Sequence, residues 1–505
     1  MDRSCSRGGK QMVEAALVGL AKVFAWPAIG YMFLGVIIGL VVGILPGIGG
    51  LFTLAVLIPF TFKMDAASAF ALLLGAHAPS YTGGAITTIL LNTPGDPPNA
   101  ATLFDGYPMT KKGQAGRALG AALSSSAVGG VLGALFMIML IPVMRPIVLI
   151  FAPPEFFMMA VVGIAFIAVI SGKSLVKGLI AGGFGLLLGF VGLDQSTSIE
   201  RFTFGTLFLW DGISLVPVTL GLFAVAEMVE TTVEGESISG KMVSSEIGGV
   251  LRGIKDTFQH FWLVLRCSVL GNIIGIIPGI GGDTACFFAY GHAKQTEKNR
   301  DQFGTGVVEG VIAPQSAINA KEGGALVPTV AFGIPGSAGM AILLGAFYIQ
   351  GIKPGPDMLN NNLWLIFLMA WTVALANIVG AGVCMSFANK LVKVALLPGD
   401  YLFPVVLLLC GIGAYCTRNA LGDLVLTMVF GFVGYGMKKY DWPRPVVIIG
   451  LVLAKIAEKN LLLSLRLYQE TFFLRPITLL LIVTVILTII FTLRGRRVKK
   501  GGVPA

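Results

Sequence analysis

The residues with the clearest capacity for binding chemistry are prolines and glycines that interrupt apolar segments. The string GILPGIGG begins at Gly43, and the nearly identical GIIPGIGG begins at Gly275, 232 positions later. A second motif follows each copy, and its prolines, Pro94 in NTPGD and Pro335 in GIPGS, are 241 positions apart. Proline removes a backbone amide donor and clashes with the preceding turn, whereas glycine adopts backbone angles that other residues resist. We therefore expect membrane helices to break at all four motifs.

Backbone groups freed at such breaks suit the binding of an anion. Within a bilayer they are tolerated only where protein or an aqueous cavity surrounds them. There, amide donors and the positive ends of helix dipoles face an anion, and freed carbonyl groups can coordinate a cation. A transporter of small carboxylates requires this chemistry. The predicted substrate-binding residues are Asn92, Thr93, Pro94, Gly95, Asn319, Gly333, Pro335, Gly336 and Ser337.

The alternative interpretation is that each Pro-Gly pair only kinks a membrane-spanning helix. The presence of two motifs at matching places in both halves of the chain favours a binding site. The apolar run before each of Pro94 and Pro335 is about ten residues, which is too short to cross a bilayer. We therefore expect re-entrant helical hairpins or half-helices that meet at mid-membrane.

The glycine-rich breaks near Pro46 and Pro278 are candidate cation sites. Asp283 follows the second break, and a carboxylate inside a membrane is costly without a partner. The alternative is that Asp283 caps the helix that follows it. Sodium and a proton both stay open as the coupling ion, and no other cofactor is expected. The candidate broken-helix and cation residues are Pro46, Gly47, Gly49, Gly50, Pro278, Gly279, Gly281, Gly282, Asp283 and Thr284.

Histidines and cysteines give weaker signals. His77 precedes the first hairpin, where it is either a proton relay or, as we favour, a hydrogen-bonded structural or surface histidine. The six cysteines contain no C-x-x-C pair, so the sequence indicates neither a metal site nor a disulfide framework.

The composition places these motifs in an all-α polytopic membrane protein. Hydrophobic residues make up 55% of the chain and charged residues 12%, against about 25% charged in soluble domains. The apolar runs indicate about 10–12 crossings. From Phe24 to Phe62 there is no charged residue, and one continuous helix there would be roughly 58 Å long, about twice the hydrocarbon thickness. That segment must break, and Pro46 is the expected place.

The distribution of charge predicts the orientation. The net charge of +10 could suggest binding of nucleic acid, but many of the basic residues crowd the tail from Arg494 to Lys500. The positive-inside rule places such a tail in the cytoplasm, so the charge is better explained by membrane orientation. Arg3, Arg7 and Lys10 give the N-terminus a weaker version of the same signal. We therefore predict a multi-pass protein with both termini cytoplasmic.

The repeated motifs divide the chain into two halves. A net acidic polar stretch near the midpoint can lie outside the cell, which makes the second half inverted relative to the first. The predicted regions are an N-terminal interfacial segment 1–25, a first membrane repeat 26–229, a polar linker 230–257, a second membrane repeat 258–493 and a basic cytoplasmic tail 494–505.

The motifs also resemble the large membrane subunit of the tripartite tricarboxylate transporters, the TctA family. The most specific strings are ILLNTPGDPPNAATLFDGYP, VPTVAFGIPGSAGMAILLGA and GAYCTRNALGDLVLTMVFGFVGYGMKKY. The resemblance implies a permease of the bacterial inner membrane that imports citrate-like or other small carboxylates by alternating access, driven by a cation gradient. It also implies two partners, a periplasmic solute-binding protein and a small four-helix membrane subunit. The chain departs from the family pattern at Gln315, Ile318 and Ala85, close to the inferred site.

Two other functional classes are less well supported. VGYG at 433–436 resembles a potassium-channel filter but occurs once, inside an ordinary apolar run. An enzyme is not expected, because H-E-x-x-H is absent and the sequence around Ser337 misses G-x-S-x-G by its first residue.

Overall fold

A computed structural model describes residues 2–45, 49–92, 94–170, 174–194, 198–234, 249–277, 281–394 and 399–487. Within these residues the chain is almost wholly helical, and a two-residue antiparallel hairpin pairs β1 (Gly192–Leu193) with β2 (Glu200–Arg201). The expected all-α membrane architecture is therefore confirmed.

The helices of the first half precede residue 235. They are α1 (Asp2–Phe24), α2 (Ala28–Ile44), α3 (Gly49–Leu57), α4 (Ala66–Leu91), α5 (Ala100–Lys111), α6 (Ala115–Ile150), α7 (Pro153–Ile170), α8 (Leu175–Gly189), α9 (Leu215–Thr219) and α10 (Ala226–Glu234). Short 3-10 segments lie at Ile58–Lys63, Pro97–Asn99 and Leu207–Leu209, and a π-helical turn spans Leu220–Val225.

The helices of the second half follow residue 249. They are α11 (Val250–Gln259), α12 (Phe261–Ile276), α13 (Gly281–Thr296), α14 (Glu309–Phe332), α15 (Ala338–Ile349), α16 (Pro356–Asn361), α17 (Leu363–Val394), α18 (Gly399–Arg418), α19 (Leu421–Lys439) and α20 (Arg444–Tyr468). Short 3-10 segments lie at Arg300–Gln302 and Gln469–Leu474, and a last apolar helix covers Pro476–Leu487.

Several helices are suited to a bilayer by length and composition. Among the described residues, Ala115–Ile150, Leu363–Phe387 and Leu421–Lys439 are each long and apolar enough to cross alone. Lys10–Phe24 and Ala28–Ile44 form a fourth span if the pair, bent by 68°, is taken together. Seven further apolar helices are shorter, at 10–17 residues. The structure is that of a multi-pass membrane protein, and the total of 10–12 crossings stays a prediction.

The two halves repeat the same close packing of helices. In the first half, a β carbon on Gly43 of α2 would lie 2.1 Å from the carbonyl oxygen of Ser80 in α4. In the second half, a β carbon on Gly275 of α12 would lie 2.5 Å from the carbonyl oxygen of Lys321 in α14. These pairs are offset by the same 232 and 241 positions as the motifs. The internal repeat is thus present in the packing, while its inversion across the membrane stays a prediction.

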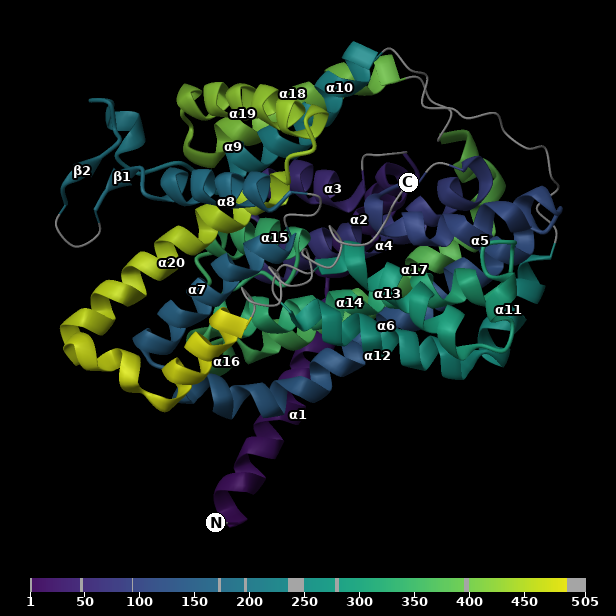
Figure 1. Cartoon of the computed structure of the whole chain (residues 1–505), viewed down its shortest axis with the longest axis horizontal. Coiled ribbons are helices and arrows are strands. Elements are labelled where there is room, and N and C mark those ends of the chain that lie inside the picture. Colours follow the sequence, from purple (N-terminus) through teal and green to yellow (C-terminus); the bar gives the residue numbers. More distant parts are fainter. Residues whose placement is uncertain are drawn as a thin grey trace, which may run out of the picture.

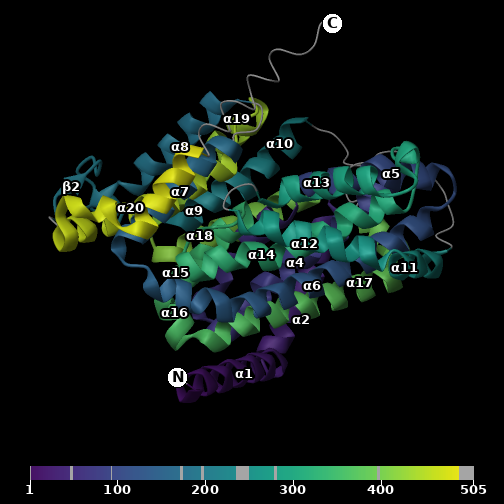
Figure 2. The same ribbon diagram turned by 60° about the horizontal axis from the view of Figure 1, so that its bottom comes forward.

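Long helices cross from each half to the other. The first-half helix α6 packs against α14, and the second-half helix α17 packs against α4. Gly133 of α6 contacts Ala320 of α14, and Gly380 of α17 contacts Pro79 of α4. Figures 1 and 2 show α4, α6, α14 and α17 together, with α7, α8 and α20 grouped to one side. The repeats are therefore interlocked rather than side by side.

The shorter helices α1 and α11 take equivalent places at the edges. α1 packs against α17, and α11 packs against α6. A β carbon on Gly253 of α11 would lie 2.0 Å from the carbonyl oxygen of Arg117, so α11 sits very close to α6. Residues 250–257 are therefore a packed helix, although the sequence places them in a polar linker.

Both glycine-rich motifs interrupt helices as expected. α2 ends at Ile44 and α3 begins at Gly49, and α12 ends at Ile276 and α13 begins at Gly281. The predicted residues Pro46, Gly47, Pro278 and Gly279 lie outside the described residues. The surroundings of Gly281, Gly282 and Asp283 are likewise outside the description.

The helices before the second motifs are longer than expected. α4 has 26 residues and α14 has 24, so each helix extends well beyond the apolar run of about ten residues that precedes its break. The re-entrant arrangement stays a prediction. The apolar runs look short because polar residues such as Ser80 and Lys321 interrupt them, yet these residues lie inside the helices and are buried. The breaks themselves fall at Asn92 and Gly333, which both adopt positive φ, 58° and 70°.

Candidate functional site

The NTPGD and GIPGS segments, residues 92–96 and 333–337, bring Gly95 and Gly336 to equivalent places in the two halves, and we call these segments the first and second tips. After each break the chain doubles back along the helix that it has left. A β carbon on Gly95 would lie 2.6 Å from the carbonyl oxygen of Gly43, and one on Gly336 would lie 2.8 Å from that of Gly275. Each tip is therefore inserted where the two closely packed helices of its own half meet.

Each tip ends by capping a new helix. The Asp96 carboxylate accepts a hydrogen bond from the Asn99 backbone N–H at 3.2 Å and from Asn99 Nδ2 at 2.9 Å. In the second tip, Ser337 Oγ accepts from the Met340 backbone N–H at 3.3 Å. Helix N-termini carry partial positive charge, so both tips bring such termini into the protein interior.

The predicted tip residues differ in their exposure. Asn92 is exposed, whereas Gly95, Gly333, Pro335, Gly336 and Ser337 are buried and Pro94 is half-buried. Thr93 lies outside the described residues.

Four ionisable side chains lie together between α4 and α14, and we call them the central charged cluster. His77 and Tyr81 come from α4, and Lys321 and Glu322 come from α14. Lys321 Nζ donates to Glu322 Oε1 at 2.5 Å and to the Tyr81 hydroxyl at 3.3 Å. His77 Nε2 lies 3.4 Å from Glu322 Oε2 and 3.5 Å from the Tyr81 hydroxyl. All four side chains are buried.

A band of neutral polar side chains continues from this cluster. Asn319 Nδ2 lies within hydrogen-bond distance of Thr82 Oγ1, Ser126 Oγ and Asn377 Oδ1, at 3.0, 2.6 and 2.5 Å. Asn319 is thus engaged with other protein side chains from three helices. The carboxylate contact expected for its amide stays a prediction.

The positions at which the sequence departs from the family pattern lie beside the same band. Gln315 Nε2 donates to Asn99 Oδ1 at 2.6 Å and to Thr102 Oγ1 at 2.8 Å, and so joins α14 to the segment after the first tip. Ile318 is fully buried in the apolar core.

Lys321 and Glu322 were not among the predicted site residues, although the sequence contains a signal for them. Between Glu309 and Lys353 they are the only charged residues. An adjacent pair of charges in an otherwise uncharged membrane segment marks a functional position by default.

Only some of the candidate cation-binding residues lie close to a tip or to the central charged cluster. A β carbon on Gly49 would lie 2.8 Å from the Asp96 β carbon, so the first broken helix touches the first tip. Gly50 faces His77 and Ser80, whereas Thr284 is exposed on α13. Within the described part of the chain, no group of three or more His, Cys, Asp or Glu side chains could hold a metal ion. Sodium binding at backbone carbonyls stays a prediction.

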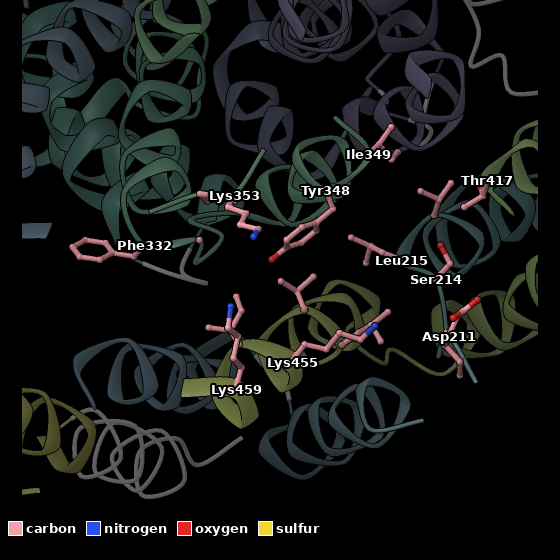
Figure 3. A pocket seen from close by; sticks show the side chains of 18 of the residues that line it. Asp211, Ser214, Leu215, Phe332, Tyr348, Ile349, Lys353, Thr417, Lys455 and Lys459 are labelled. Carbon is pink, nitrogen blue, oxygen red and sulfur yellow. The ribbon is translucent and has the colours of Figure 1, made fainter. Parts of the chain in front are cut away.

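A cavity of about 830 Å³ opens beside the second tip, where Phe332 and Gly333 form part of its wall. Lys353 and Tyr348 lie on one side, and Lys455 and Lys459 of α20 face them from the other side (Figure 3). We call this cavity the lysine pocket.

The charges around the lysine pocket are unbalanced. Its three lysines make no hydrogen bond or salt bridge with a described residue, and Asp211 is the acidic residue of the lining. Arg418, also in the lining, is paired with Asp423 through two hydrogen bonds of 3.0 and 2.6 Å. Three lysines against one aspartate leave an excess of two positive charges, so the pocket suits an anion.

Comparison with known proteins agrees with this membrane architecture. Residues 29–449 match the family model described as the tripartite tricarboxylate transporter TctA family. An uncharacterized 52.8 kDa protein in the TAR-I ttuC' 3' region of Agrobacterium vitis is 34% identical over 435 residues, which cover 85% of this chain and 86% of that protein. An uncharacterized protein in the TAR-II ttuC' 3' region of the same organism is 30% identical over 237 residues, covering 45% of this chain and 97% of that protein. No solved structure matches.

Proposed function

The chain belongs to the tripartite tricarboxylate transporter TctA family, and from that premise we propose that it is the large membrane subunit of a secondary transporter that imports small carboxylates. In this proposal it lies in the bacterial inner membrane. A periplasmic solute-binding protein delivers the carboxylate, and a small four-helix membrane subunit completes the complex. A cation gradient drives uptake.

The main support for the proposal is the presence of two equivalent tips, one in each half of the chain. Gly95 and Gly336 occupy equivalent places in the two halves, and the helices that begin after them point their N-termini into the interior. Paired broken helices at the interface of two repeats are the arrangement in which secondary transporters bind substrate. Rigid-body movement of one group of helices against the other then exposes the site to each side in turn.

The lysine pocket supports an anionic substrate. It adjoins the second tip at Gly333, and its excess positive charge would attract carboxylates from water. We propose that the pocket is the vestibule through which a carboxylate reaches the tips. The tip residues and Asn319 then form the binding site itself.

Uptake by the reconstituted complex tests the proposal. The chain and both partner subunits would be placed in vesicles and supplied, through the binding protein, with radiolabelled citrate, succinate, malate or acetate. Saturable, gradient-driven uptake of at least one is expected. An ohmic current without saturation would instead support a channel, and no uptake of any of them would contradict the proposal.

Two tip variants locate the site. Ser337→Ala and Asn92→Ala are expected to lower the affinity or rate of uptake, because each removes a polar group at a tip. Ser386→Ala is the matched control, since Ser386 is exposed on α17 and bonds only within its own helix. Unchanged uptake in both tip variants would show that the tips do not bind substrate.

A further inference from the structure

We propose that His77 binds the proton that is transported together with the carboxylate, so that the coupling ion is a proton and its site is the central charged cluster. This inference rests on the proposed function, because it presumes that the chain imports an anion against a gradient.

The imidazole of His77 lies between the broken segments of the two halves. A β carbon on Gly50, in the first turn of α3, would lie 3.0 Å from His77 Nδ1. A β carbon on Gly339, in the first turn of α15, would lie 2.4 Å from His77 Nε2. The ring therefore touches the helix that follows the first break and the helix that follows the second tip. Movement of either helix changes the surroundings of His77.

One ring nitrogen of His77 is unused. Nδ1 is buried and has no hydrogen-bond partner among the described residues. Nε2, by contrast, faces Glu322 and Tyr81. A buried polar atom without a partner is costly and calls for a functional explanation. Reversible protonation provides one, because it changes the ring from one N–H donor to two.

The groups that face His77 can be named from each element packed around it. α4 contributes Tyr81, and α14 contributes Lys321 and Glu322. α3 and α15 bring Gly50 and Gly339 against the ring. Among the described residues, Glu322 is the charged group that an ion-pair distance joins to the ring, and Lys321 contacts both Glu322 and Tyr81.

Charge counting shows why the proton and the carboxylate favour one another. The Lys321 ammonium and the Glu322 carboxylate are paired at 2.5 Å and cancel. The cluster is then neutral when His77 is neutral, and carries one positive charge when His77 is protonated. An excess charge in a membrane interior is costly without a counter-ion. A carboxylate at the adjacent tips supplies it, so each ligand strengthens binding of the other.

The coupling step involves only proton transfer. A proton from water on the outer side forms an N–H bond at His77, and the carboxylate occupies the tips. After the helices move, the N–H bond breaks, the proton passes to water on the inner side and the carboxylate leaves unchanged. Glu322 and Lys321 act as positioning residues, because they hold the ring and fix the charge of the cluster.

The first test uses the unaltered chain in the complete complex. Vesicles loaded with a pH indicator would be given whichever of citrate, succinate, malate or acetate is taken up. Acidification of the lumen together with uptake, in the absence of sodium, is expected. Uptake that moves no proton would overturn this inference alone. Absence of uptake would overturn the proposed function, and the inference with it.

The second test separates coupling from translocation. His77→Gln is expected to abolish accumulation driven by a proton gradient while retaining exchange of labelled for unlabelled carboxylate at a raised KM, because the tip residues are intact but the favourable charge of protonated His77 is lost. Exchange verifies that the variant is folded. His292→Gln is the control, since His292 lies half-buried on α13 away from the cluster and is expected to keep both activities. Full gradient-driven accumulation in His77→Gln would overturn the inference.

Discussion

Gly95 lies so close to Gly84 that a β carbon on Gly95 would be 2.4 Å from the Gly84 α carbon. In the second half, Gly336 stands in the same relation to Ala325, with a corresponding distance of 2.7 Å. Two backbones that approach this closely leave no room for a side chain. The tips pack against α4 and α14 about two turns before those helices end, and glycine at positions 95 and 336 makes this close approach possible.

The first prediction follows from this contact. Gly95→Ala and Gly336→Ala are each expected to lower the free energy of unfolding by about 1–3 kcal/mol, because the added methyl group meets backbone atoms that cannot move aside. Both are also expected to impair carboxylate uptake. Thermal unfolding of the purified protein and vesicle uptake measure the two effects.

A matched glycine provides the control. Gly183 of α8 has no neighbouring atom within 4 Å of its β-carbon position. Gly183→Ala should leave uptake intact and keep or raise stability, because alanine favours a helix more than glycine does. Equal behaviour of Gly95→Ala and Gly183→Ala would contradict the steric argument.

The breaks could be predicted from sequence because their cause is local. A proline and a glycine stand two and three positions after both Ile44 and Ile276, and these residue types disfavour a continued helix through the backbone itself, whatever surrounds them. The repeat was also visible, since the offsets between the motifs reappear as offsets between packed glycines. The uninterrupted length of α4 could not be predicted in this way. His77 and Ser80 interrupt the apolar run, and they can lie inside a buried helix because Glu322 of α14 faces His77 and the glycines of α2 and α3 pack against Ser80.

The grouping of lysines around the lysine pocket could not be predicted from the sequence either. Lys353 follows α15, whereas Lys455 and Lys459 lie one turn apart on α20 about 100 residues later. No periodicity or motif in the sequence connects Lys353 with Lys455 and Lys459. They face one cavity because the chain folds back through α17, α18 and α19 before α20 begins.

The second prediction concerns these lysines. Lys459→Gln and Lys353→Gln are each expected to raise the KM for carboxylate uptake by about three- to ten-fold, with little change in kcat, because each removes one attractive charge from the vestibule. The increase should shrink at high ionic strength, where charges are screened. Initial rates of uptake at low and high salt would measure this.

An exposed lysine outside the cavity is the control. Lys298 lies beyond the end of α13 and contributes nothing to the pocket lining. Lys298→Gln should leave the KM unchanged at both salt concentrations. If it raises the KM as much as Lys459→Gln does, the effect comes from overall charge and not from the pocket.

The third prediction separates two roles for Asn319. Its amide contacts Thr82, Ser126 and Asn377 within the protein. Asn319→Ala is expected to lower the free energy of unfolding by about 1–3 kcal/mol, because buried oxygens lose their donor. Asn361→Ala, at an exposed position on α16, should have little effect. A raised KM for uptake is expected as well, because Asn319 belongs to the proposed binding site. An unchanged KM would remove it from that site and leave it a structural role.

The fourth prediction concerns the pH dependence of stability at the junction of α11 and α12. There, His260 Nε2 lies 3.4 Å from Glu309 Oε1, and its Nδ1 lies 2.9 Å from the Asp256 carbonyl oxygen. The hydrogen bond to Glu309 raises the pKa of His260 from its ordinary value of 6.5 to about 9. Because the folded state holds this proton more tightly than the unfolded chain, the interaction stabilises the fold while the ring is charged.

The sign of the effect follows from the raised pKa. The stabilising contribution is fully present below pH 6.5, declines as the pH rises, and is lost above about 9. His260→Gln should therefore lower the melting temperature most at pH 6, and the difference from the unaltered protein should vanish near pH 10. His292→Gln, measured in parallel, should show no such dependence. A difference that is constant from pH 6 to pH 10 would mean that His260 acts through packing rather than through its charge.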